Sequence, residues 1–358
     1  MDVDRGAWQY KNAYLTTARI EDPKMKQLRD LVEGSKMQRW AVVILILVLV
    51  ALAYRQTIVT TYIDHDRAID EANHKGHAPA LIQVKTLDPR HLPRTSKTTP
   101  DQPAAGKRLI FVGDIHGCMQ ELQALLRKVN YKQDTDHIIA LGDMINKGPD
   151  SKGVVNFLMD QGASAVRGNH EDSILLAANN LPPLPPDSPS LANAAIEESP
   201  KIKLARTFTQ SQTHWLNTCP VILRVGDLDH HGDIVAVHGG LVPGIPLEKQ
   251  NPNSVMNMRT INPKSRKPSA EHVLKGSVPW AEYWDKSQKS LLHRKFFFGR
   301  KKKPTTVVFG HDARKRLQIL TYAKGLDTSC VKGNQLTAWV VSDFGKDTIV
   351  QVQCKGYV

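Results

Sequence analysis

Apolar positions in residues 106–358 fall into short runs, and the early runs are each followed by a stretch with helical periodicity. Three such pairs come first: apolar runs at 109–113, 137–143 and 163–167, with helical stretches near 117–129, 151–161 and 170–178. Further strands are predicted at 233–238, 305–310, 336–342 and 347–353, the last two as an antiparallel pair. Alternation of strands and helices is typical of a parallel α/β core.

One longer apolar run stands apart from this pattern. The stretch WAVVILILVLVALAY at 40–54 contains no charged residue. Continued through QTIVTTYI, it exceeds the roughly 20 residues that span a bilayer, provided that Arg55 extends its charge to the membrane surface. Trp40 and Tyr54 lie where interfacial aromatic residues are common. We therefore predict a membrane helix over 40–63, with a cleaved signal peptide or a buried helix as alternatives.

The segments around this helix complete the predicted organisation. Residues 1–39 are polar, and more Lys and Arg precede the apolar run than follow it, so this segment is predicted to be cytosolic. Residues 64–105, rich in His, Pro, Thr and Asp, are predicted to be a stalk. Residues 106–358 form the predicted folded domain, with a basic insertion at 249–304. This order predicts a single-pass type II membrane protein.

Charge and cysteine content narrow the possible partners. The chain carries 48 Lys and Arg against 35 Asp and Glu, a net charge of +13. A basic surface suits a polyanion such as nucleic acid, anionic lipid or phosphate, although it also serves solubility. The basic run HRKFFFGRKKKP at 293–304 is therefore either a solvated loop or a track for a linear polyanion. The four cysteines form no CxxC pair, so free thiols are expected, and a lumenal location permits one bridge.

Residues of the metal-ligand type come directly after several of the predicted strands. In open α/β sheets, sites gather outside the carboxyl ends of the strands. We expect six such side chains to converge in one crevice: Asp114, His116, Asp143, Asn169, His238 and His311. Taken singly, an Asp in such a place is more often a turn former or a helix cap. Together, three oxygen ligands and three imidazoles suit two divalent ions, with Asp143 as the natural bridge.

The motifs GDIHGC, GDMINKGPD, GNHED, HGG and GHD, in that order, resemble those of the calcineurin-like metallophosphoesterases. The resemblance covers residues 106–358. GLDTSCVKGNQLTAW at 325–339 looks most like the diadenosine-tetraphosphatase branch, and the anchored organisation looks like that of the fungal vacuolar endopolyphosphatases. The fold that this resemblance implies is α/β: a four-layer α/β/β/α sandwich with mixed sheets, here preceded by the N-terminal membrane helix. The implied location is the vacuole membrane with a lumenal domain; a membrane protein facing the cytoplasm is the alternative.

The resemblance also implies roles for individual residues. One ion is held by Asp114, His116 and Asp143, and the other by Asp143, Asn169, His238 and His311. Zn, Mn, Fe and Mg all remain open, with Zn or Mn favoured, and the ion pair activates a water for in-line attack on phosphorus. Arg167 and Arg259 clamp phosphoryl oxygens, for which a guanidinium fork is well suited. His170 protonates the leaving oxygen.

One motif departs from the protein-phosphatase branch, which reads GDxVDRG where this chain reads GDMINKG. Asn146 replaces an acid that pairs with the general-acid histidine, here His170, and Lys147 replaces an arginine. A carboxylate partner raises the pKa of a histidine, and an amide supplies no such charge. His170 is therefore expected to be a poorer acid, which matters for a basic alkoxide leaving group and little for a phosphate. The departure favours phosphoanhydride substrates.

These observations predict a membrane-anchored dinuclear-metal phosphoesterase, with endopolyphosphatase activity on inorganic polyphosphate. The alternatives are a symmetrical bis(5'-nucleosyl)-tetraphosphatase and a serine/threonine protein phosphatase. A non-catalytic binding module is disfavoured, because such a protein has no reason to keep six metal-ligand residues. A nucleoside would need an apolar slot, for which Trp280, Tyr283 and Trp284 are candidates. The expected partners are polyphosphate or another polyanionic phosphate, and the membrane; no nucleic acid is expected. The oligomeric state stays open.

Overall fold

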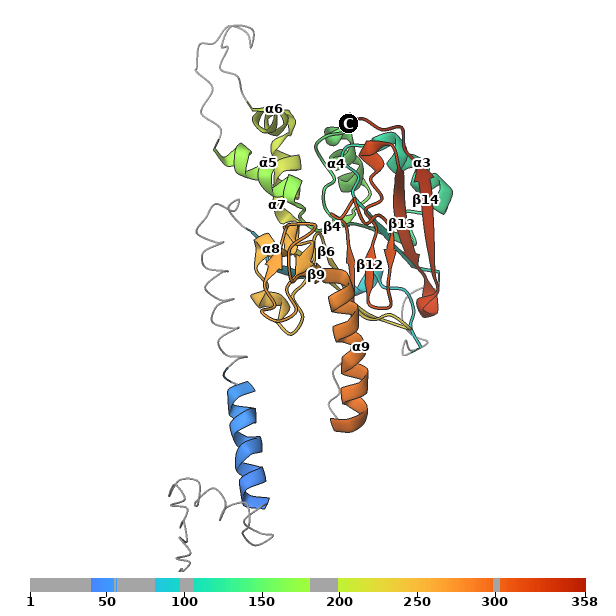
Figure 1. The fold of residues 1–358 in the computed structure, drawn as a ribbon. Helices are drawn as coiled ribbons and strands as arrows, with labels where there is room; N and C mark the ends of the chain where they lie inside the picture. Colours follow the sequence, from blue (N-terminus) through green and yellow to red (C-terminus); the bar gives the residue numbers. More distant parts are fainter. Residues whose placement is uncertain (1–39, 55, 57–80, 97–105, 181–198, 299–302) are drawn as a thin grey trace, which may run out of the picture. The chain divides into compact units, whose positions relative to one another are not determined.

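The structure, a computed structural model, describes residues 40–54, 56, 81–96, 106–180, 199–298 and 303–358 (Figure 1). The chain divides into two compact units, residues 1–62 and 63–358, and each is described by itself. The predicted cytosolic segment at 1–39 lies outside the described residues, as do residues 299–302 of the basic run and the side chains of 292–298.

The first sheet of the larger unit is five-stranded, in the order β14-β13-β2-β3-β4. Its strands are β2 (Arg108–Val112), β3 (Asp136–Ala140), β4 (Ser164–Ala165), β13 (Gln335–Val341) and β14 (Asp347–Gln353). β2, β3 and β4 run parallel, whereas β13 pairs antiparallel with both β2 and β14. The predicted strands are thus present, and the predicted antiparallel pair is confirmed, but the core is mixed rather than parallel.

The second sheet is six-stranded, in the order β1-β5-β6-β10-β12-β11. Its strands are β1 (Val84–Thr86), β5 (Ile222–Leu228), β6 (Gly232–Val237), β10 (Thr305–Phe309), β11 (Gln318–Ile319) and β12 (Ala323–Gly325). β6, β10 and β12 are parallel, and β5 and β11 are antiparallel to their neighbours β6 and β12. Both sheets are therefore mixed, as the resemblance predicted.

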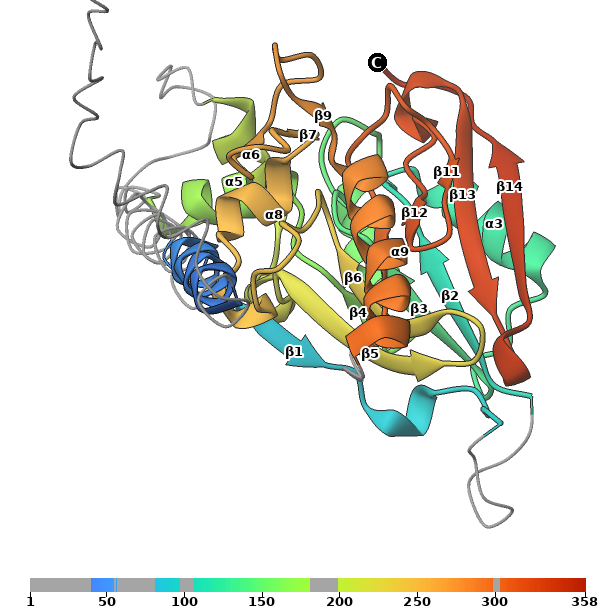
Figure 2. The ribbon, with the colours of Figure 1, turned by 60° about the horizontal axis from the view of Figure 1, so that its bottom comes forward.

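Strand alternation sorts the apolar side chains into separate layers. Leu109 and Phe111 of β2 face the second sheet in one cluster, whereas Ile110 and Val112 face the helices in another. The helices of that outer layer are α3 (Met119–Val129), α4 (Ser151–Asp160), α5 (Asn169–Asn179), α6 (Pro200–Thr207) and α7 (Gln210–Thr218). A third cluster packs α8 (Pro252–Asn257) and α9 (Trp280–Phe298) on the second sheet, and Figure 2 shows α9 lying across it.

The predicted insertion at 249–304 has regular structure in its described part. It contains α8, α9 and a small sheet of β7 (Thr260–Ile261), β8 (Pro268–Ser269) and β9 (Val278–Pro279). Trp280 and Trp284, the candidate walls of a nucleoside slot, are almost completely buried, and Trp280 packs edge-on against Phe309. They are therefore core residues; Tyr283 is partly buried and packs against the same core.

The N-terminal boundary and the cysteines also differ from expectation. β1 lies within the predicted stalk, yet it pairs in parallel with β5, so the folded unit includes residues before 106. Cys330 and Cys354 form a disulfide across 24 positions of the chain, and Cys118 and Cys219 are free and buried. The expectation of free thiols is thus wrong for one pair. The bridge ties the loop after β12 to the end of β14.

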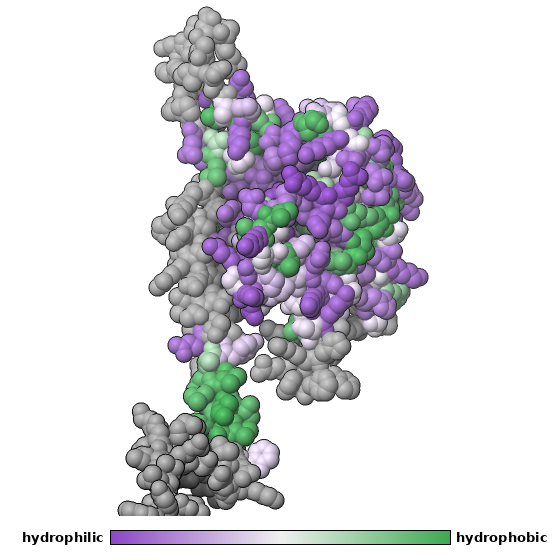
Figure 3. All heavy atoms as spheres, viewed as in Figure 1, coloured by the Kyte–Doolittle hydropathy of each residue, from purple (hydrophilic) through white to green (hydrophobic). Residues whose placement is uncertain are grey.

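The described part of the chain contains no helix that is both long and apolar enough to cross a membrane. The described helix over residues 40–54 has fifteen residues. Its surface is apolar (Figure 3). Residues 55 and 57–63 of the predicted membrane helix lie outside the described residues. The predictions that rest on a membrane helix over 40–63 are therefore wrong: a single-pass protein of the vacuole membrane with a lumenal domain, and the alternative of a membrane protein facing the cytoplasm.

Candidate active site

The six predicted ligand residues lie together where strands of both sheets end. Asp114 and His116 follow β2, Asp143 follows β3, and Asn169 begins α5 after β4. From the second sheet, His238 follows β6 and His311 follows β10. All are buried except Asn169, which is partly buried. Convergence at one rim follows because β2, β3 and β4 are parallel, as are β6 and β10, so the carboxyl ends of these strands meet.

Asp143 is at the centre of the cluster. Its Oδ1 is 3.3 Å from Nε2 of His238, and its Oδ2 is 3.6 Å from Nε2 of His116 and 3.8 Å from Nε2 of His170. Two groups of metal-binding type share it: His116, Asp143 and His170, and Asp143, His238 and His311, with the ligand atoms of each group within 4.8 Å of one another. Asp114 lies beside the first group, with Oδ2 3.9 Å from Nε2 of His116. Asp143 can therefore contribute to two ions at once.

The hydrogen bonds of the imidazoles test whether this cluster fits metal ions. Nδ1 of His116 is 3.2 Å from the carbonyl of Ile145, and Nδ1 of His238 is 2.8 Å from the carbonyl of Leu141. A carbonyl only accepts, so each Nδ1 carries a proton. In the neutral form of each ring, Nε2 then has a lone pair directed toward Asp143, which is the form that binds a metal ion; without an ion, the carboxylates favour a proton on Nε2 of His238 instead. Backbone carbonyls that fix ligand histidines in this way are the usual outer shell of a metal site, so the residues fit divalent ions.

The pKa shifts of the clustered side chains also indicate a site for cations. Burial lowers the pKa of His238, but the carboxylates of Asp143 and Asp114 overcome it and raise that pKa to about 10. Burial raises the pKa of Asp143, yet the neighbouring His238 brings it well below its usual value. Burial, together with the nearby Lys147 and His170, lowers the pKa of His116 to about 4, although Asp143 opposes this. A buried carboxylate whose charge is compensated by neighbouring imidazoles occupies a place where a metal cation is favourable.

The backbone is held in an uncommon conformation at the same positions. His116, Asp143, Asn146, Lys147 and His311 all have φ between 48° and 72°. Residues other than glycine rarely adopt this left-handed region, which costs of order 1 kcal/mol or more each, and such residues cluster at functional sites. The loops after β2, β3 and β10 therefore hold their side chains against local preference, and the surrounding contacts supply the compensation.

Glu171 is a functional residue that the sequence analysis missed. Its carboxylate accepts hydrogen bonds from the backbone N–H groups of Asp143, Met144, Ile145 and Gly168 at 2.8–3.2 Å. Burial and the nearby Asp143 raise its pKa to about 7. The signal was its place in GNHED, where a glutamate three residues after the N-cap Gly168 can accept the backbone N–H of the cap, which is one half of a capping box. Glu171 fixes the loop that presents Asp143.

The remaining predicted residues divide into two groups. Nζ of Lys147 is 3.0 Å from Nε2 of His116, and Arg259 contributes to the lowered pKa of His311, so both cations are at the cluster. Arg167 is completely buried; it donates to the carbonyl of Asn217 at 2.8 Å and to Asp172 at 3.4 Å. These contacts tie Arg167 to α7 and α5, which is a structural role rather than that of a phosphoryl clamp.

Comparison with known families decides what this arrangement belongs to. The family model described as calcineurin-like phosphoesterase matches residues 107–341. The chain belongs to the calcineurin-like phosphoesterase family. This phosphoesterase is 32% identical over 284 residues to a protein of Saccharomyces cerevisiae named zinc-dependent endopolyphosphatase, covering 69% of this chain and 81% of the relative. It is also 25% identical over 293 residues to a symmetrical bis(5'-nucleosyl)-tetraphosphatase of Nitrosospira multiformis, covering 68% and 94%.

A solved structure supports the same conclusion. The crystal structure of a putative diadenosine tetraphosphatase is 33% identical, with a TM-score of 0.56, and the match covers 76% of this chain and 97% of that one. The resemblance stated from the motifs is thus confirmed, and the phosphoesterase is a hydrolase of phosphoanhydride or phosphoester bonds. Its cofactor is a pair of divalent ions, as the family's dinuclear site requires.

Proposed function

We propose that this phosphoesterase hydrolyses phosphoanhydride bonds within chains of inorganic polyphosphate. The observation that carries the proposal is the pairing of His170 with an amide. Nδ2 of Asn146 is 2.8 Å from Nδ1 of His170, and Oδ1 of Asn146 accepts the backbone N–H of Lys147 at 2.8 Å. The second bond decides which way the amide faces, because only its oxygen can accept from the backbone.

The amide orientation sets the protonation of His170. Since the NH₂ group of Asn146 donates to Nδ1, that nitrogen carries the lone pair and Nε2 carries the proton. Nε2 lies 3.8 Å from Oδ2 of Asp143, so its N–H group faces the centre. Burial also lowers the pKa of His170. A neutral imidazole held in this tautomer can donate a hydrogen bond to a phosphoryl or leaving oxygen, but it is a weak source of a full proton.

The leaving group then determines which substrates react. An alkoxide from serine or threonine is strongly basic and needs a proton, whereas a phosphate, whose second pKa is roughly 6, leaves without one. Asp114, His116 and Asp143 would hold one ion, and Asp143, Asn169, His238 and His311 the other. When bound, the ions supply an activated water and charge neutralisation. Lys147 and Arg259 add positive charge where phosphoryl oxygens arrive, and Arg259 offers a guanidinium fork.

Two further observations support polyphosphate over the alternatives. The Saccharomyces relative is named an endopolyphosphatase. A bis(5'-nucleosyl)-tetraphosphatase is the second candidate, because relatives and one solved structure carry that name. Against it, the buried Trp280 and Trp284 leave no stacking slot at the places where the sequence suggested one. A serine/threonine protein phosphatase is disfavoured by Asn146.

The test is a substrate comparison with the purified full chain, with Zn, Mn, Fe or Mg supplied in turn. Long-chain polyphosphate, diadenosine tetraphosphate and a phosphopeptide are compared by kcat/KM, and polyphosphate products are sized on gels. We expect chains of intermediate length to form before single phosphate accumulates. Preference for the phosphopeptide, or cleavage of the tetraphosphate with polyphosphate left intact, would refute the proposal.

A further inference from the structure

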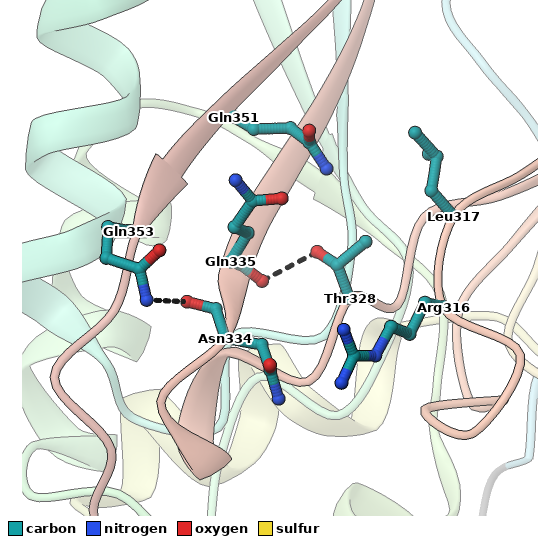
Figure 4. Close-up of a pocket in the computed structure, with 7 residues that line it drawn as sticks. All are labelled: Arg316, Leu317, Thr328, Asn334, Gln335, Gln351 and Gln353. Carbon is teal, nitrogen blue, oxygen red and sulfur yellow. Dashed lines mark hydrogen bonds between the residues drawn. The ribbon is translucent and has the colours of Figure 1, made fainter.

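A polar pocket of about 480 Å³ opens on the larger unit beside β13 and β14 (Figure 4). Four amide side chains line it, together with Thr328, Leu317 and the guanidinium of Arg316. The amides belong to Asn334, Gln335, Gln351 and Gln353. Gln335 and Gln351 are on the face of the first sheet that looks toward the second, because they alternate with residues that pack on the helices. The pocket therefore opens between the two sheets.

The chain connects this pocket directly to the metal-ligand cluster. Thr328 follows Asp327, whose side chain hydrogen-bonds Asp114. The backbone N–H of Arg316 donates to the carbonyl of Asp312 at 3.2 Å, next to His311. The carbonyl of Thr337, two residues along β13 from Gln335, accepts the N–H of Gly113 at 3.0 Å. At about 3.3 Å per residue, Gln335 is roughly 7 Å along β13 from Thr337. Thr337 in turn contacts Gly113, the residue before Asp114.

Three of the lining side chains are available for a ligand. Within the described residues, the side chains of Arg316, Asn334 and Gln335 make no hydrogen bond or ion pair with the protein. Thr328, by contrast, already donates to the carbonyl of Gln335 at 2.6 Å, which stiffens the wall. No carboxylate is among the described residues that line the pocket. The available groups are thus a guanidinium fork and amide N–H donors, in a site without negative charge.

From these observations we propose that the pocket binds phosphoryl groups of the polyphosphate chain several units from the scissile bond. The inference rests on the proposed function, because an enzyme that cuts within a chain must bind the chain beyond the reacting phosphorus. A guanidinium matches phosphoryl oxygens in pairs, and amide N–H groups add neutral donors. A nucleoside fits less well, because bases are usually held by stacking, and among the described residues of the lining Leu317 alone has an apolar side chain.

The substitution Arg316→Gln tests the charge, and Gln335→Leu tests the amide at similar volume. Arg127→Gln is the matched control: Arg127 is also exposed, but it lies on α3.

We expect Arg316→Gln to raise KM for long-chain polyphosphate about tenfold, the value of one charge-assisted hydrogen bond. Its kcat should be unchanged, and the salt dependence of KM should become flatter. Gln335→Leu should raise KM a few-fold without changing the salt dependence. Hydrolysis of a small aryl phosphate should be equal in all variants.

Inhibition separates this proposal from the proposed function. Polyphosphate should inhibit aryl phosphate hydrolysis competitively whether or not it is cut, and Arg316→Gln should weaken that inhibition about tenfold. If wild-type enzyme binds polyphosphate in this way without cleaving it, the proposed function fails and the pocket assignment stands. Two results would overturn the pocket assignment: both variants matching Arg127→Gln, or a larger change in KM for diadenosine tetraphosphate than for polyphosphate, which would make the pocket a nucleoside site.

Discussion

Replacing Asn146 by Asp should change the chemistry of His170 without changing its position. One carboxylate oxygen would still accept the N–H of Lys147, as the amide oxygen does at 2.8 Å. The other would face Nδ1 of His170, where the amide nitrogen now lies at 2.8 Å. Two acceptors cannot share that contact, so the proton moves to Nδ1 and the new negative charge favours the imidazolium.

The size of the effect follows from the environment of the pair. Burial now lowers the pKa of His170, and a carboxylate partner opposes this directly. Asn146 is only partly buried, so water screens part of the attraction and the general acid is restored in part. A positioned general acid contributes about 10²–10⁴-fold, so we expect a gain of at least ~10-fold in kcat on an alkyl or aryl phosphomonoester. Polyphosphate, whose leaving group needs no proton, should change little.

The assay is the ratio of kcat/KM for the monoester to that for polyphosphate, measured from pH 5 to 8. The variant should also retain its monoester activity to higher pH than wild type, because the acid form persists. Imidazole ¹⁵N shifts report the tautomer of His170 independently of activity. Asn146→Leu, which removes the hydrogen bonds without adding charge, is the control and should not increase the ratio. An unchanged ratio in Asn146→Asp, with the proton demonstrably on Nδ1, would refute the leaving-group argument.

Four further predictions follow from individual contacts. Asp143→Asn should abolish turnover and lower the bound metal measured by elemental analysis, because Asp143 belongs to both ligand groups; wild-type activity with two ions bound would contradict the assignment. Glu171→Gln should lower the free energy of unfolding by about 2 kcal/mol or more in denaturant titrations, because two of four backbone donors would face an NH₂ group. Cys330→Ser should lower that free energy by about 3 kcal/mol, the loop-closure value for a bridge across 24 positions, and wild type in reductant should match it. Burial lowers the pKa of His137 to about 4, so the unfolded chain binds more protons and wild type should lose up to about 3 kcal/mol between pH 6.5 and 4; in His137→Asn this part of the loss should be absent.

The parts of the fold that local pattern specifies were predictable. β2 and β13 alternate between two apolar faces, and β13 and β14 are long enough for their antiparallel pairing to be read from their order. β1 has only three residues, and what makes it a strand is its pairing with β5, more than a hundred positions away. Such long-range pairing leaves no local signal.

The difference between what local sequence specifies and what long-range packing specifies also applies to the metal-ligand cluster. The convergence of the six candidate ligands could be predicted because each comes soon after a strand, and topology then brings them together. Arg167 and Asn146 show what sequence cannot decide. Both are adjacent to ligand motifs, but Arg167 is directed away to the carbonyl of Asn217, whereas Asn146 faces His170. Whether a side chain contacts the metal-ligand cluster depends on tertiary packing: Arg167 is held by the carbonyl of Asn217 on α7. The local sequence does not specify such a contact.

The structure separates two determinants of substrate choice that the motif comparison left combined. In the proposed function, Asn146 acts on the leaving group, because it sets the proton on His170, and its effect belongs in kcat. In the proposed pocket, Arg316 and the amides act on the chain remote from the scissile bond, and their effect belongs in KM. The two sites lie on different loops, one after β3 and the other after β10, and share no hydrogen-bond partner among the described residues. Their free energies should therefore add. A relative could keep the anhydride preference while losing the preference for long chains, simply by changing the residue at position 316.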